Sequence, residues 1–371
     1  MRGGLAVVAV AASAVIATAS PGRSVERRDE VLRLIKTSEA DPGTWMTEAE
    51  KIANFGTKRG GWLDVTSASP EVLALMSSNA SHSVRRTATA FPTELSHNEE
   101  AEKYISKVQT CGTKQWMRNL TDFYTRDYQT ELGVQSGQWL LETVSYFAGR
   151  NPNAVVTTMK HDGFDQETII ATYPGESPAL VVVGAHYDST TVSPSGRAPG
   201  ADDNGSGVVV ILEALRVLAK YGFKPKNTLE FHFYAGEEGG ELGSFDLWSR
   251  YNEEGKSVVA FVNQDMAGYS PSHAVSVFTD YADPGLVAYA QLIARVYTGT
   301  EPTSDICGYG CSDHYPAYLY GFPVVYVCDE PIATSSPYYH TEEDAYDTIM
   351  WDAIERHAIF TTGFLIEASY L

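Results

Sequence analysis

The sequence has little positive charge, and it lacks the motifs of two large classes of hydrolase. Its 371 residues include 27 Lys and Arg against 47 Asp and Glu, which gives a formal net charge of −20 at pH 7. Nucleic acids and anionic membrane surfaces would repel such a chain, so neither is an expected partner. The sequence contains no G-x-S-x-G nucleophile elbow and no H-E-x-x-H motif, which argues against a serine hydrolase and against a zincin.

Long apolar runs are also scarce, and the only one near spanning length stands at the N-terminus. Arg2 precedes an apolar, small-residue run from Leu5 to Ala17, and Ala17-Thr18-Ala19 fits the A-x-A pattern of a cleavage site. This pattern is typical of a secretory signal peptide, because the run is too short and alanine-rich to span a bilayer comfortably. A membrane anchor is the alternative. We therefore predict a signal peptide at residues 1–19 and a secreted, extracellular protein.

Cysteine is rare as well. The chain has four cysteines, namely Cys111, Cys307, Cys311 and Cys328. In a secreted protein they permit disulfide bonds, with three possible full pairings. Cys307 and Cys311 are close enough in sequence to bridge within one tight loop, and a zinc finger at this pair is disfavoured because no second Cys/His pair stands at finger spacing. Sequons at Asn79 and Asn119 predict glycans in a eukaryotic host.

The N-terminal quarter differs in composition from the rest of the chain. Residues 20–92 are charged and helix-prone, and a helix is predicted at Trp45–Phe55, with Thr47 as cap and Glu50 three residues later. Ser77–Pro92 is rich in Ser, Thr and Ala and is typical of a linker. We interpret residues 20–92 as a small helical pro-segment before the enzyme. A small, stable accessory domain is the alternative.

Beyond this segment, residues 93–371 alternate between strand and helix patterns and are predicted to form one catalytic domain. Strands are expected at Glu167–Tyr173, Ala179–Gly184, Thr228–Tyr234, Val258–Val262, Ala274–Phe278 and Pro323–Val327, and helices at Gly205–Lys220, Leu286–Val296 and Trp351–Ser369. Continuous apolar strands that alternate with helices predict an α/β fold, with a mostly parallel, mixed central sheet covered on both faces. Ligands of such sheets bind beyond the carboxyl ends of the strands.

Polar side chains follow the predicted strands at those ends. His186 comes directly after the strand 179–184, and Asp188 is suited to hold its other ring nitrogen. Asp202 and Asp203 stand between glycines just before a predicted helix. A helix N-cap accounts for one carboxylate there, but it does not account for both together with Asn204.

A second pair of carboxylates ends the next strand. Glu237 and Glu238 follow the strand 228–234, and their mutual repulsion would raise the pKa of one of them unless a cation intervenes. Asp265 follows the strand 258–262, and His340 lies in a polar aromatic loop. Mixed imidazole and carboxylate ligands suit zinc, and this many carboxylates suit two ions with a bridge.

Taken as a set, these motifs resemble the secreted bacterial and fungal leucyl aminopeptidases, which are co-catalytic zinc exopeptidases of α/β fold. The resemblance runs from about Ser96 to the carboxyl terminus, in the right order and with compatible spacing. Trp45-Met46-Thr47-Glu48 and Trp62-Leu63-Asp64-Val65-Thr66 also resemble the pro-region of the fungal members. The motifs that match are Gly184-Ala185-His186-Tyr187-Asp188, Pro199-Gly200-Ala201-Asp202-Asp203, Glu237-Glu238, Gln264-Asp265-Met266, Cys307-Gly308-Tyr309-Gly310-Cys311-Ser312-Asp313-His314 and Tyr339-His340-Thr341.

The resemblance implies a site with two zinc ions. Asp203 would bridge the ions, His186 and Asp265 would complete the ligands of one, and Glu238 and His340 would complete those of the other. Asp202 would only support the bridge. The same comparison gives no role to Ser312, Asp313 and His314, although all three match the motif.

It also implies the remaining parts of the mechanism. Glu237 would be the general base beside a metal-bound hydroxide, Tyr309 would stabilise the tetrahedral intermediate, and Cys307–Cys311 would be a disulfide that shapes the Tyr309 loop. Leucine-like substrates are implied by resemblance alone, because Met266 and the nearby aromatics fit core packing equally well.

We therefore expect a monomeric, secreted di-zinc aminopeptidase that removes the first residue from peptides with a free N-terminus. Two rivals share the fold. A glutaminyl cyclase would use one zinc ion and usually lacks part of this ligand set. A non-catalytic binding module would have lost ligands or the base, whereas this chain keeps all of them.

Overall fold

A computed structural model describes residues 32–55, 61–77, 90–193 and 196–371. The predicted signal peptide, the sequon at Asn79 and most of the predicted linker lie outside these residues. Within the described ranges, no helix is long and apolar enough to cross a membrane.

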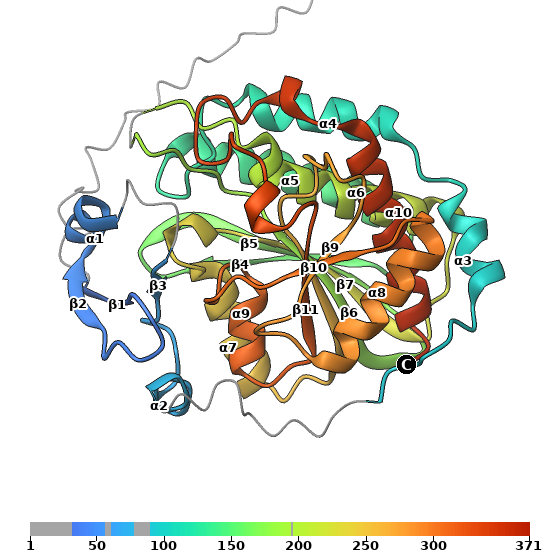
Figure 1. The fold of residues 1–371 in the computed structure, drawn as a ribbon, viewed down its shortest axis with the longest axis horizontal. Coiled ribbons are helices and arrows are strands. Elements are labelled where there is room, and N and C mark those ends of the chain that lie inside the picture. The colour runs from blue at the N-terminus through green and yellow to red at the C-terminus, as the bar shows by residue number, and fades with distance from the viewer. Residues whose placement is uncertain (1–31, 56–60, 78–89, 194–195) are drawn as a thin grey trace, which may run out of the picture.

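An eight-stranded mixed sheet forms the centre of the protein (Figure 1). Its inner strands run parallel, and antiparallel pairings occur between β11 and β9 and among β7, β5 and β4. From one edge to the other the strands are β10 Thr303–Asp305, β9 Ser276–Phe278, β11 Val324–Cys328, β8 Val258–Gln264, β6 Ser177–His186, β7 Asn227–Tyr234, β5 Phe164–Tyr173 and β4 Val155–His161.

Both faces of this sheet are buried. Successive residues of a strand point to opposite faces, so the apolar residues of one central strand pack into two different hydrophobic clusters. In β6, Val181 and Val183 belong to the larger hydrophobic cluster, whereas Leu180 and Val182 belong to the smaller one. This explains why the sequence of β6 is continuously apolar rather than alternating with polar residues.

Helices cover the two faces unequally. The larger cluster joins the sheet to α3 Asn98–Ile105, α4 Thr110–Asp122, α5 Glu131–Ala148, α6 Gly207–Tyr221, α8 Pro284–Thr298 and α10 Trp351–Ala368. The smaller cluster joins the other face to α7 Leu242–Glu253 and α9 His314–Leu319. Figure 1 shows α7 and α9 on the side of the sheet opposite to α4, α5 and α6.

The N-terminal segment forms a small unit of its own, drawn in blue in Figure 1. It holds a three-stranded antiparallel sheet in the order β2-β1-β3, and α2 packs on the α7 and α9 side of the protein. Its elements are β1 Leu32–Lys36, β2 Thr44–Thr47, α1 Glu48–Phe55, β3 Leu63–Asp64 and α2 Pro70–Ser77.

The sequence predicted the capping of α1 correctly but not its start. The amide of Thr47 donates to Glu50 Oε2 at 2.8 Å, and the amide of Glu50 donates to Thr47 Oγ1 at 3.2 Å, which together form a capping box. Residues 45–47 belong to β2 rather than to the helix. The segment is therefore only partly helical, because the three-stranded sheet was not expected.

The predicted fold class is confirmed. All six expected strands and all three expected helices of residues 93–371 are present, with boundaries shifted by a few residues. Two edge strands, β4 and β10, were missed because β4 is largely exposed and β10 has three residues, so neither gives a clear apolar pattern.

Candidate metal centre

The side chains expected to bind metal meet at the carboxyl ends of three neighbouring parallel strands. His186 ends β6 and lies opposite Tyr234 of β7, so the loop with Glu237 and Glu238 begins at the same level. Gly184 of β6 lies opposite Asn263 of β8, which brings Asp265 to that level as well. The parallel register thus gathers four of the expected residues at one sheet edge.

Asp203 reaches the same place from the turn before α6. Gly200 adopts a left-handed conformation with φ of 51°, and a β-carbon there would collide with the carbonyl oxygen of Asp203. Glycine is therefore required at this position. The Asp203–Asn204 peptide bond is cis. Asn204 also begins a third sequon, Asn204-Gly205-Ser206, and this sequon is inaccessible because Asn204 is fully buried.

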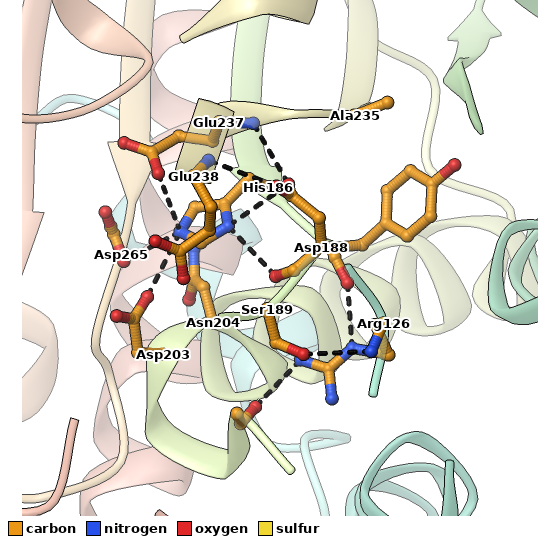
Figure 2. Close-up of polar contacts among 12 residues, drawn as sticks. Arg126, His186, Asp188, Ser189, Asp203, Asn204, Ala235, Glu237, Glu238 and Asp265 are labelled. Atoms are coloured by element: carbon orange, nitrogen blue, oxygen red, sulfur yellow. Dashed lines mark hydrogen bonds and ion pairs between the residues drawn. The ribbon is translucent and has the colours of Figure 1, made fainter. Parts of the chain in front are cut away.

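The carboxylate of Asp203 lies between the two histidines (Figure 2 shows Asp203 beside His186). Its Oδ1 is 3.2 Å from His186 Nε2, and its Oδ2 is 3.0 Å from His340 Nε2. Asp265 Oδ1 is 3.4 Å from His186 Nε2, and Glu238 Oε2 is 2.9 Å from His340 Nε2. The five side chains therefore form two groups that share Asp203.

These separations fit zinc. Two atoms that each lie about 2.0–2.1 Å from one tetrahedral zinc ion are about 3.3–3.4 Å apart. The distances from Asp203 and Asp265 to His186 match that spacing, and those to His340 are slightly shorter. Two carboxylate oxygens, Asp265 Oδ1 and Glu238 Oε1, are buried without a hydrogen-bond partner among the described residues. Nitrogen and oxygen donors of this kind are common zinc ligands.

The electrostatics of the cluster also favour cations. Burial and then nearby carboxylates raise the pKa of Glu237 well above its ordinary value, while His186 opposes the shift. Burial raises the pKa of Glu238 to about 7 against the effect of His340. Burial alone would lower the pKa of both histidines, but adjacent carboxylates outweigh it and raise the pKa well above the usual value. Acids that tend to hold protons and histidines that tend to be charged indicate an excess of negative charge.

Asp188 supports both the first histidine and the glutamate loop (Figure 2). The carbonyl oxygen of Asp188 lies 3.3 Å from Nδ1 of His186, and its carboxylate Oδ1 lies 3.6 Å from the same nitrogen. Its two carboxylate oxygens also accept the amides of Glu237, at 3.1 Å, and Glu238, at 3.0 Å. One fully buried carboxylate therefore sets the position of two strand ends.

Three positioning residues were not assigned from the sequence. Arg126, which Figure 2 shows below Asp188, is fully buried. Its guanidinium ties the two loops around His186 and Asp203 together, because it donates to the carbonyls of Tyr187, Leu120, Pro199 and Gly200. Asp344 accepts the amides of Asp202 and Asp203 at 2.8 and 3.0 Å. Ser312 Oγ donates to Asp265 Oδ2 at 2.6 Å and accepts from Asn263 Nδ2.

The contact of Ser312 leads to a prediction. Ser312→Ala removes the hydrogen bond that orients Asp265, so zinc affinity is expected to fall by about 10–100-fold. Competition with a chromophoric chelator measures this affinity. Ser276→Ala is a matched control, because Ser276 is an equally buried serine of β9 whose hydroxyl has no partner among the described residues. An unchanged affinity in Ser312→Ala would contradict the assigned role.

A pocket of about 370 Å³ opens directly onto the candidate metal ligands, and part of its wall is formed by Asp203, Glu238, Asp265 and His340. Tyr309 lines the pocket from a loop closed by a Cys307–Cys311 disulfide, with a Cα–Cα distance of 6.3 Å. The disulfide implied by the family resemblance is thus present, whereas Cys111 and Cys328 are free thiols. The residues of the motif that follow are buried: Asp313 and His314 are almost inaccessible, and His314 stacks on Tyr326.

Comparison with known proteins identifies the family. Residues 168–364 match the profile described as Peptidase family M28. The chain belongs to peptidase family M28. It is 37% identical over 331 residues to the "Probable leucine aminopeptidase" of Arthroderma benhamiae, which covers 88% of this chain and 89% of that protein. It is 35% identical over 379 residues to "Leucine aminopeptidase 1" of Arthroderma otae, covering 97% and 98%.

Solved structures of aminopeptidases share this fold. The LapA aminopeptidase of Legionella pneumophila superposes with a TM-score of 0.76 at 26% identity, over 87% of this chain and 89% of that one. A Bacteroides thetaiotaomicron glutaminyl cyclase gives 0.58 at 19% identity, over 70% and 98%, which shows a shared fold alone. The M28 family and the aminopeptidase relatives confirm the predicted enzyme class, a zinc-dependent aminopeptidase.

Proposed function

We propose that this M28 peptidase is a di-zinc aminopeptidase that hydrolyses the N-terminal peptide bond of peptides. The observation that supports this most directly is the position of Asp203, with one carboxylate oxygen near each histidine. A single-zinc site would need only one of the two groups of side chains that share Asp203. His186, Asp203 and Asp265 would hold one ion, and Glu238, Asp203 and His340 the other. When bound, zinc ions lower the pKa of a water molecule toward about 7 and polarise the peptide carbonyl.

The residues of the chain would supply the proton transfers and the orientation. Glu237 Oε2 is 3.9 Å from His186 Nε2, farther than Asp203 and Asp265, and Glu237 lines the pocket. This position supports Glu237 as the group that would take a proton from the attacking water and deliver it to the leaving amine. Tyr309 would donate its phenol hydrogen to the developing oxyanion from the opposite loop.

The substrate pocket favours apolar side chains at the first position. Phe278, Tyr326 and Cys328 form a hydrophobic cluster with Met266, and all four line the pocket. Such a wall supports a preference for leucine-like residues, since it offers the side chain apolar contact. We propose in addition that the protein is secreted, acts as a monomer and can carry a glycan at Asn119.

Substrate assays test the proposed function. Leucine p-nitroanilide and peptides with a free N-terminus are expected to be cleaved, and N-acetylated peptides are not. A chelator should abolish the activity and added zinc should restore it. Conversion of N-terminal glutamine to pyroglutamate without hydrolysis would favour the cyclase, and chelator-sensitive activity on neither class would reject both functions.

We also propose that residues 20–92 are a pro-segment that restricts the pocket. Phe55 and Trp62 of the N-terminal segment line the pocket together with Tyr309, and the amide of Asp64 donates to the carbonyl of Gly240 at 3.3 Å. Lys51 is 2% exposed, and its Nζ contacts Glu48 at 2.8 Å as well as the carbonyl of Gly239 at 3.2 Å. A buried lysine paired in this way fastens the segment to the glutamate loop.

Cleavage of the linker is therefore expected to activate the enzyme. A specific protease site placed within residues 78–89, followed by cutting and removal of the fragment, should raise kcat/KM on leucine p-nitroanilide by about tenfold or more, because an apolar cap leaves the pocket. The unmodified protein treated with the same protease is the control. Equal activity before and after complete removal of the fragment would argue for an accessory domain instead.

A further inference from the structure

Glu241 is a buried acid in the pocket wall that the proposed zinc chemistry does not use. It stands directly before α7, is 3% exposed with the N-terminal segment in place, and lines the same pocket as Glu237 and Tyr309. Within the described part of the chain, its Oε2 atom has no hydrogen-bond partner. A carboxylate oxygen buried without a partner is unfavourable, so its surroundings suit a ligand that brings a positive charge or a donor.

The backbone of Glu241 is held firmly in an unusual conformation. Its φ of 62° lies in the left-handed region, where glycine is favoured over residues with a β-carbon. Its amide donates to the carbonyl of Glu237 at 2.7 Å, and its carbonyl accepts the amide of Phe245 at 2.9 Å. The backbone therefore gives no reason for a glutamate at this position. These two hydrogen bonds hold the backbone from which the Glu241 side chain enters the pocket wall.

The neighbours of Glu241 leave its charge unbalanced. Burial, followed by the nearby carboxylates of Asp313 and Asp265, raises the pKa of Glu241 well above its ordinary value. The three proposed ligand carboxylates and the proposed base match the positive charge of two zinc ions. No positive charge then remains to balance the carboxylate of Glu241. A positive charge that enters with the substrate would stabilise the carboxylate.

The sheet order separates Glu241 from the apolar wall of the pocket. The wall residues Phe278, Tyr326 and Cys328 belong to β9 and β11, on one side of the strands β8 and β6 that lead to Asp265 and His186. Glu241 follows β7, on the other side of those two strands. The apolar wall and Glu241 therefore lie on opposite sides of the strands that carry the proposed ligands, which leaves Glu241 free to contact the part of a peptide beyond the bond to be cleaved.

We propose that Glu241 binds the cationic side chain of a lysine or arginine at the second position of the peptide substrate. Glu241 is thus a specificity residue rather than a catalytic one, and the inference rests on the proposed aminopeptidase function. A charge-assisted hydrogen bond in a partly desolvated pocket is expected to give about a tenfold preference in kcat/KM over a neutral side chain of similar length.

Tripeptides that differ only at the second residue test the proposal. The wild-type protein and Glu241→Gln, made in one host and brought to the same processed state, are assayed on Leu-Lys-Ala, Leu-Gln-Ala and leucine p-nitroanilide. The wild type should cleave Leu-Lys-Ala about tenfold faster than Leu-Gln-Ala, and the variant should lose that preference. The effect of the variant on leucine p-nitroanilide, which has no second residue, should be much smaller. Glu343→Gln, an exposed acid near His340, is the charge-matched control.

Several outcomes would overturn the proposal. The proposal fails if the wild type shows no preference for Leu-Lys-Ala over Leu-Gln-Ala, or if Glu241→Gln keeps that preference. It also fails if Glu241→Gln loses as much activity on leucine p-nitroanilide as on Leu-Lys-Ala. Finally, it fails if the variant loses activity on Lys-Ala-Ala, whose lysine is the first residue, rather than on Leu-Lys-Ala. If the variant does not fold, the salt dependence of the wild type decides, because only Leu-Lys-Ala should be cleaved more slowly as salt screens the contact. Zinc-dependent cleavage without the lysine preference rejects this inference alone, whereas no cleavage rejects the proposed function.

Discussion

Glu237→Ala is expected to keep its fold and its zinc while losing turnover by about 10²–10⁴-fold, the usual contribution of a positioned general base. Glu237 lines the pocket beside the metal-binding side chains, and its amide rather than its carboxylate is held by Asp188. Removing the side chain therefore leaves the proposed ligands in place. Measurement of kcat on leucine p-nitroanilide, together with the zinc content after gel filtration, tests this expectation.

The isosteric Glu237→Gln should behave in the same way, since it keeps the shape of the side chain but cannot take a proton. Glu343→Gln controls for the change in net charge, because this exposed acid follows the His340 loop without lining the pocket. A Glu237 variant that retains a rate near that of the wild type would remove this residue from the mechanism. Loss of zinc together with the loss of rate would instead indicate that it is a ligand.

Asp203→Ala is expected to have the opposite signature, with loss of metal as well as of activity. The Asp203 carboxylate is the only group within hydrogen-bond distance of both His186 Nε2 and His340 Nε2 among the described residues. Its removal would leave each ion with two of its proposed protein ligands, fewer than zinc sites usually have. The zinc content should fall below one ion per chain, measured by elemental analysis on protein whose folding is verified by circular dichroism.

Asp202→Asn is the informative control, since Asp202 is the adjacent and equally buried carboxylate. Its Oδ1 accepts the amide of Gly268 at 2.8 Å, and it forms no ion pair with His186 or His340 among the described residues. This variant is expected to keep its zinc. If both variants lost zinc equally, the distinction between a bridging and a supporting carboxylate would be wrong.

The main features of the fold and the candidate ligands could be predicted from the sequence for one physical reason. Buried parallel strands are continuously apolar, so a histidine or carboxylate immediately after them stands out and falls at the ligand-binding edge. His186 is the last residue of β6, Asp265 directly follows β8, and Glu237 and Glu238 follow β7. The roles given to them came from family resemblance and stay predictions until they are tested.

The supporting contacts could not be predicted because they join distant parts of the chain. Arg126 binds carbonyls of residues 187, 199 and 200, and nothing in its local sequence indicates that it is buried. Asp344 lies four residues after His340 in the sequence, but its contacts with the amides of Asp202 and Asp203 exist only in the folded chain. The N-terminal sheet was missed because its strands are two to five residues long.

The number of zinc ions required for activity tests the central claim most directly. The metal-free protein would be titrated with zinc while bound metal is counted by native mass spectrometry and activity is followed on leucine p-nitroanilide. We predict that the fully active enzyme binds two zinc ions per chain and that both are lost in Asp203→Ala. Full activity with a single ion per chain, and no second binding event, would contradict the di-zinc account.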